Sequence, residues 1–156
     1  MILPAVPAAA VPPGGGVSLR AFGEEAIIHL STEQTGGTCN VWTEITPPGG
    51  GPPPHYHENE DEWFLVQEGR LAFFSDGQWQ EFPPGALLFM PRRHVHGFKN
   101  VGDTPSRILI TTAPAGFDKY FARCAEEFAK PGEPDMQKII AISAEFGIHF
   151  AEEAQA

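Results

Sequence analysis

Two short histidine motifs stand out in the chain, HYH at 55–57 and HVH at 94–96. Side chains alternate between the two faces of a β-strand, so His55 and His57 can point at one centre. Glu62 follows five residues after His57 and can reach the same centre if the residues between them turn. Imidazole and carboxylate ligands together suit first-row transition metals such as Fe, Mn, Co, Ni, Cu and Zn. The pattern therefore predicts a metal site, to which strand parity would allow either histidine of the second motif to contribute.

The loop before Glu62 carries three more acidic residues, Glu58, Glu60 and Asp61. We interpret them as solvated loop charges, because consecutive acidic side chains are usually exposed. Glu60 and Asp61 remain alternatives to Glu62 as the carboxylate ligand.

Short runs of β character must position these side chains. The chain has 17 glycines and 16 prolines, which separate the runs and supply turns. The runs are 17–22, 25–31, 38–46, 62–67, 71–75, 79–82, 86–90, 96–100 and 106–112. Short strands at this spacing predict an all-β sandwich or barrel. Asp76-Gly77 between two of the runs predicts a type I′ hairpin turn.

The apolar pattern becomes helical after Pro114. Over 116–130 the apolar residues recur at helical spacing, and charged residues lie between them. A second helix is predicted from Pro134 to just before Gly147, because proline fits the first turn and glycine follows the end. We expect both helices to pack on the barrel or against a second subunit as structural cover. The predicted organisation is a flexible arm over 1–16, a barrel over 17–114 and a helical extension over 115–150.

The composition restricts the partners. The net charge is −10, which opposes binding to nucleic acid or to an anionic membrane surface. The chain has no apolar run long enough to span a bilayer, and its proline-rich start lacks the features of a secretory signal. Cys39 and Cys124 match no metal or redox spacing, and we interpret them as free buried thiols rather than as a disulfide. A cytoplasmic protein with a small organic substrate is expected.

The longer spacing resembles the two conserved motifs of the cupin superfamily. The first reads glycine, five residues, HxH, four residues, glutamate, six residues, glycine, and the second supplies another glycine, proline, histidine and asparagine. Nine positions match in order, namely Gly49, His55, His57, Glu62, Gly69, Gly85, Pro91, His96 and Asn100. Arg93 departs from the second motif, which usually has glycine there to allow a positive φ. The resemblance covers about residues 38–112.

The resemblance implies a double-stranded β-helix, or jelly-roll, barrel with a C-terminal pair of α-helices. It implies one divalent transition metal ion bound by His55, His57, Glu62 and His96, with His94 at the rim or behind the ligands. It also implies open coordination positions of the kind found in catalytic metal sites. Cupins commonly dimerise, so a homodimer is expected.

The chain as a whole is most similar to bacterial single-cupin proteins related to quercetinase. The stretches at 51–69 and 91–100 and the tail from Pro114 carry this similarity. It implies a dioxygenase acting on a flavonol-like or other small enolic or phenolic substrate, with Glu62 as general base. A metal-dependent isomerase or decarboxylase, and a non-catalytic protein that binds a small molecule, are the alternatives.

Apolar residues near the predicted ligands indicate a mostly apolar, aromatic pocket that suits a flat substrate. We expect it to be lined by Trp42, Phe64, Phe89, Met90 and Phe98. Arg92 and Arg93 at its rim are candidates to bind a substrate carboxylate, and are equally well explained as solvated charges.

Overall fold

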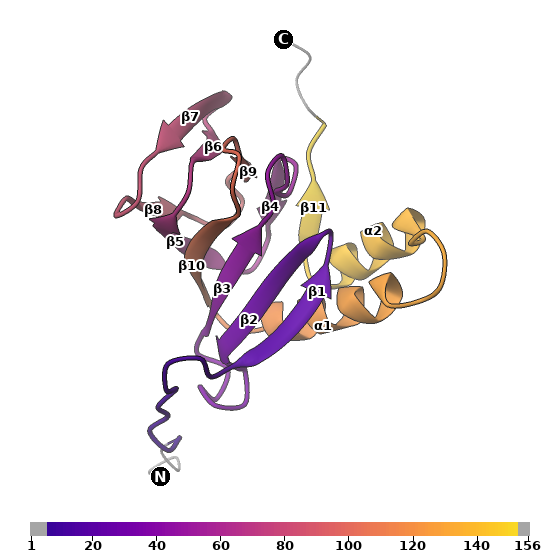
Figure 1. The fold of residues 1–156 in the computed structure, drawn as a ribbon. Helices are drawn as coiled ribbons and strands as arrows, with labels where there is room; N and C mark the ends of the chain where they lie inside the picture. Colours follow the sequence, from indigo (N-terminus) through magenta and orange to yellow (C-terminus); the bar gives the residue numbers. More distant parts are fainter. Residues whose placement is uncertain (1–5, 153–156) are drawn as a thin grey trace.

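A computed structural model describes residues 6–152, which form two β-sheets and two helices (Figure 1). The first five residues of the predicted arm lie outside the described residues. The strands are β1 (Val17–Ala21), β2 (Glu24–Leu30), β3 (Asn40–Thr46), β4 (His55–His57), β5 (Asp61–Glu68), β6 (Leu71–Ser75), β7 (Gln78–Phe82), β8 (Leu87–Met90), β9 (His96–Asn100), β10 (Ser106–Ala113) and β11 (Ile148–Phe150). The helices are α1 (Phe117–Phe128) and α2 (Met136–Glu145). The predicted β class and the C-terminal helices are confirmed.

The two sheets face each other across one core. One has the order β1-β2-β3-β10-β5-β8, and the other has the order β11-β4-β9-β6-β7. Alternate residues of each strand point inward, as the period of two requires. Phe64 of the first sheet meets Phe73 and Phe98 of the second, with ring centroids 5.5 and 6.2 Å apart. This arrangement is the predicted double-stranded β-helix.

The turns explain the glycines of the two motifs. Gly49, Gly69 and Gly85 have φ values of 77, 90 and 93°, a region that residues with a Cβ rarely adopt. Arg93 adopts a φ of 66° at the position where the motif usually has glycine. The turn therefore has the backbone conformation that glycine would give it. The Arg93 amide donates to the His57 carbonyl oxygen at 2.7 Å. This conformation strains a non-glycine residue by about 1 kcal/mol.

The predicted hairpin turn is confirmed at Asp76-Gly77. Their φ values are 51 and 77°, both positive as a type I′ turn requires, and Ser75 pairs with Gln78 across the turn.

The C-terminal helices lie next to β1, at the edge of the six-stranded sheet (Figure 1). Helix α1 packs along β1, and α2 packs on α1. The second helix begins at Met136 rather than at Pro134, because the Asp135 side chain caps it by accepting from the amides of Gln137 and Lys138. The sequence pattern did not predict β11, which pairs with β4 and places the end of the extension beside the HYH motif.

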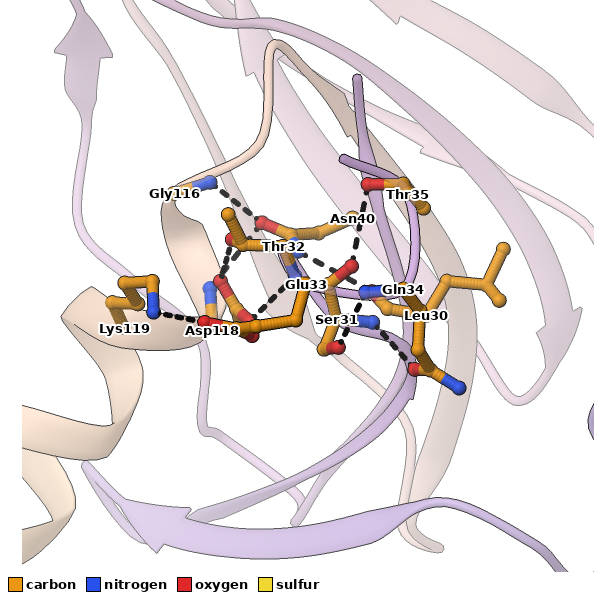
Figure 2. Close-up of polar contacts among 10 residues, drawn as sticks. All are labelled: Leu30, Ser31, Thr32, Glu33, Gln34, Thr35, Asn40, Gly116, Asp118 and Lys119. Atoms are coloured by element: carbon orange, nitrogen blue, oxygen red, sulfur yellow. Dashed lines mark hydrogen bonds and ion pairs between the residues drawn. The ribbon is translucent and has the colours of Figure 1, made fainter. Parts of the chain in front are cut away.

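A polar network fixes the start of α1 to the loop between β2 and β3 (Figure 2). Asn40 Oδ1 accepts from the amides of Gly116 at 2.8 Å and of Asp118 at 3.4 Å. Asp118 in turn accepts from the amide and the hydroxyl of Thr32 at 2.9 and 2.5 Å. Asn40 is fully buried, so these bonds replace the water that the first amides of the helix would otherwise need.

Both cysteines are free thiols; Cys124 is buried, whereas Cys39 is only partly buried. Neither helix in residues 6–152 combines the length and apolar character needed to cross a bilayer.

Candidate metal centre

Four predicted ligands meet at one point between the two sheets. His55 and His57 lie on the same face of β4, His96 is the cross-strand partner of His55 on β9, and Glu62 comes from β5 of the opposite sheet. One ligand atom from each residue lies within 4.8 Å of the others. All four side chains are buried, with 2–8% of their surface exposed. Alternation along the HYH strand thus produces the convergence that the spacing predicted.

Hydrogen bonds on the far side of each imidazole ring aim its other nitrogen at the centre. His55 Nδ1 lies 2.8 Å from the Pro53 carbonyl oxygen, and His96 Nδ1 lies 2.8 Å from the His94 carbonyl oxygen. His57 Nδ1 lies 3.1 Å from Glu60 Oε2. Oxygen partners of this kind hold the proton on Nδ1 and leave Nε2 as a lone-pair donor.

The atoms at the centre fit a divalent metal. Glu62 Oε1 and His96 Nε2 are buried and have no hydrogen-bond partner among the described residues, which is costly unless an ion satisfies them. Glu62 Oε1 also lies 2.5 Å from His57 Nε2 without hydrogen-bond alignment, and 3.7 Å from His96 Nε2. Three imidazole nitrogens and one carboxylate oxygen suit a first-row transition metal. The cluster can therefore hold such an ion through His55, His57, Glu62 and His96.

The pKa values of His55, His57 and Glu62 are shifted in different directions. Burial, reinforced by neighbouring His96 and His57, lowers the pKa of His55 to about 3. Burial also opposes protonation of His57, but the carboxylates of Glu62 and Glu60 outweigh it and raise its pKa to about 9. Burial likewise opposes ionisation of Glu62, yet His57 and His96 hold the pKa of this carboxyl well below its usual range. A metal at this site would take the place of the proton on His57.

The structure corrects the interpretation of the acidic loop at one position. Glu60 is not a solvated charge: it is 8% exposed, and its carboxylate holds His57. Glu58 is exposed and pairs with His149, and Asp61 pairs with Arg92, so neither lies at the cluster. The sequence could have indicated Glu60 by its position three residues after His57, within reach across a tight turn.

The remaining candidates lie outside the centre. The His94 side chain faces Asp76 at 3.3 Å, and only its backbone carbonyl serves the site, by holding His96. Arg92 makes a two-point contact with Asp61 at 3.1 and 3.2 Å, which occupies the guanidinium group that was a candidate for a substrate carboxylate.

A cavity of about 410 Å³ opens from the cluster and is lined mainly by aromatic side chains. Trp42, Phe64 and Phe98 line it as predicted. Phe89 and Met90 were predicted wrongly, because neither lines the cavity; Phe89 is 52% exposed on the outer face of β8.

The sequence pattern missed two contributions to the cavity wall. Helix α1, interpreted as structural cover, supplies Phe117, Tyr120 and Phe121. The Phe117 ring stacks on Trp42 with centroids 4.0 Å apart and an interplanar angle of 4°. The second contribution is a pair of buried acidic residues, Glu24 and Glu44.

Comparison with known proteins agrees with this architecture. Residues 42–112 match the family model described as "Cupin domain", and the matched segment contains all four residues of the cluster. Residues 42–112 therefore resemble a cupin domain, and the chain is similar to the quercetinase-like cupins.

Particular relatives can be named. Over 101 residues the chain is 26% identical to quercetin 2,3-dioxygenase of Bacillus subtilis (strain 168), covering 65% of this chain and 30% of that protein. Over 70 residues it is 27% identical to an uncharacterized protein of Methanocaldococcus jannaschii, covering 45% of this chain and 56% of that protein. The chain thus spans between about a third and just over half of these relatives' lengths. A predicted oxalate decarboxylase of Thermotoga maritima shares the fold, with a TM-score of 0.63, 21% identity, and coverage of 68% of this chain and 99% of that one.

Proposed function

We propose that this protein is a metal-dependent dioxygenase that acts on a flat, flavonol-like or other phenolic or enolic substrate. The observation that carries the proposal is the position of the metal cluster beside an aromatic cavity, whose wall includes His55, His57 and Glu62. Such a cavity offers apolar faces to a planar ring and a single polar centre to its hydroxyl group. The likeness to quercetin 2,3-dioxygenase supports the same substrate class.

The cluster and the residues around it have distinct roles in the proposed reaction. A divalent metal held there would supply a Lewis acid that lowers the pKa of a substrate hydroxyl. Glu62 accepts the hydroxyl proton, because it is the one carboxylate among the four residues of the cluster. The three imidazoles stay oriented during this proton transfer, because each Nδ1 is held by an oxygen of Pro53, His94 or Glu60. The aromatic side chains of the cavity wall, among them Trp42 and Phe64, exclude water from the electron-rich substrate.

Oxygen consumption tests this proposal. Protein reconstituted separately with Fe, Mn, Co, Ni and Cu would be given quercetin in an oxygen electrode. We expect uptake that needs both metal and quercetin, is lost in His57→Ala and persists in His94→Ala, whose side chain points away from the cluster.

The opposite results are equally informative. Protein that retains metal but shows no uptake with any of the five ions would contradict the dioxygenase and leave an isomerase, a decarboxylase or a binding protein. Metal retained by His57→Ala but lost by His94→Ala would contradict the ligand assignment itself.

A further inference from the structure

Two buried carboxyl groups lie in the cavity away from the metal cluster. Glu24 of β2 and Glu44 of β3 are 7% and 3% exposed, and both line the cavity. The β2–β3 register pairs Ala26 with Glu44, so Glu24, two residues earlier, points to the same face. The two side chains are therefore diagonal neighbours on adjacent strands, within reach of each other.

Only some of the carboxylate oxygens of this pair have a hydrogen-bond donor. Glu44 Oε2 accepts from Trp42 Nε1 at 2.7 Å, and Glu24 Oε1 accepts from the Thr46 hydroxyl at 3.2 Å. Glu44 Oε1 is buried and has no donor among the described residues. Across residues 6–152, neither carboxyl forms an ion pair with lysine, arginine or histidine.

Two adjacent carboxylates in such a place cannot both be ionised at low cost. Burial, together with the repulsion between the two groups, raises the pKa of Glu44 well above its usual range, and burial raises that of Glu24. We expect the pair to share one proton, because two adjacent carboxylates repel each other. It offers a ligand both a hydrogen-bond acceptor and a donor in an otherwise apolar space.

The strand register separates the pair from the cluster. Across β10, Glu44 is level with Val66, which lies four residues beyond Glu62 on β5. Four residues correspond to about 13 Å of backbone along the strand direction, and the Glu62 charge still contributes to the raised pKa of Glu44. Aromatic side chains, among them Phe64, Trp42 and Phe117, line the space between the two polar ends.

We propose that Glu24 and Glu44 are a second anchoring site of the cavity, where they hydrogen-bond a hydroxyl group on the end of the ligand distant from the metal cluster. The inference rests on the proposed function and narrows its substrate class to flat aromatic compounds with hydroxyl groups at both ends. A hydroxyl group fits best because it donates and accepts at once, as the singly protonated pair does. A carboxylate would be repelled, and an ammonium group would lose its hydration on entering an apolar cavity.

Ligand binding to a matched pair of probes tests the proposal. Quercetin and 3-hydroxyflavone share the hydroxyl that would face the metal, but only quercetin carries further ring hydroxyls. Binding would be followed by quenching of tryptophan fluorescence in zinc-loaded protein without oxygen, which separates binding from turnover.

Two variants make the test specific. Glu44→Gln keeps an acceptor for Trp42 and a donor for Glu24, but it puts an NH₂ group, which cannot accept a hydrogen bond, in place of Oε1. Glu25→Gln is the control on β2, next to Glu24, since Glu25 lies on the outer face with Arg20 and Ser18. We expect Glu44→Gln to weaken quercetin binding at least about tenfold and 3-hydroxyflavone binding less than about twofold. Glu25→Gln should change neither, and Glu24→Gln should resemble Glu44→Gln.

The outcomes separate the anchoring site from the proposed function. Equal weakening of both probes in Glu44→Gln would indicate a structural role and overturn the anchoring site, as would no change in either. In both cases the wild-type protein would still bind the flavone core, and the dioxygenase proposal would stand. If zinc-loaded wild-type protein bound neither probe, the proposed substrate class and the anchoring site would fall together.

Discussion

At the scale of single residues, the orientation of His57 depends on Glu60. The Glu60 carboxylate is buried and 3.1 Å from His57 Nδ1, so it fixes the ring that presents Nε2 to the cluster. Loss of such a partner typically weakens metal affinity 10–100-fold. We expect this loss in Glu60→Gln, measured by competition with a chromophoric chelator. Glu58→Gln, two residues away on the exposed side, is the matched control, and equal metal affinity in the two variants would contradict the role of Glu60.

Glu44 gives a prediction about pH and stability. Its folded-state pKa lies well above the ordinary value of 4.5, so the folded protein keeps a proton that the unfolded chain has released. The stabilising contribution of this group is complete below pH 4.5 and is lost as the pH rises through the folded pKa. Glu44→Gln removes this dependence. The melting temperature of Glu44→Gln minus that of wild type should increase as the pH is raised from about 4.5 to 8. A difference that stays constant over this range would show that Glu44 is ionised in the folded protein.

The sequence could predict the four residues of the metal cluster but not the pair Glu24 and Glu44. His55, His57, Glu62 and His96 follow from alternation on a strand and from fixed motif spacing, which the structure brings together within 4.8 Å. Glu24 and Glu44 have no such signal. They are 20 residues apart in the chain and become neighbours only through the β2–β3 pairing, which local pattern does not determine.

At the scale of elements, α1 depends on Asn40. Oδ1 of this buried side chain accepts from the Gly116 and Asp118 amides, and Nδ2 donates to the Leu30 carbonyl oxygen at 3.3 Å (Figure 2). In Asn40→Ala these groups stay buried without partners, which costs about 1–3 kcal/mol for each one left unsatisfied. We expect the free energy of unfolding in urea to fall by about 2–4 kcal/mol, with faster hydrogen exchange across α1.

The control for this variant lies in the loop that precedes β3. Gln34 accepts from the Ser31 amide at the exposed surface, so Gln34→Ala should change stability by less than about 0.5 kcal/mol. Unchanged exchange in α1 of Asn40→Ala would mean that the helix is held by its aromatic face alone.

The elements show a second limit of the sequence pattern. Helical spacing predicted α1 within two residues of its bounds, and it identified the apolar face correctly. It could not show that this face closes a cavity, because an apolar stripe looks the same whether it covers a filled core or an open one. The stacking of Phe117 on Trp42 depends on the tertiary path that brings α1 to the barrel mouth.

At the scale of the whole molecule, the cluster joins the two sheets. Glu62 belongs to one sheet and the three histidines belong to the other, so an ion bound to all four would link them only in the folded state. Such an ion stabilises by mass action, by about 4 kcal/mol at a free concentration 1,000 times its dissociation constant. For a domain of this size that corresponds to roughly 10 °C in melting temperature. Zinc-loaded protein should therefore melt about 10 °C above the same protein treated with a chelator, in a calorimetric scan. His57→Ala should show little difference between the two states, because it lacks one ligand and the cluster then binds zinc weakly. Equal melting temperatures for loaded and chelated wild-type protein would mean that the four residues do not hold the ion together across the sheets.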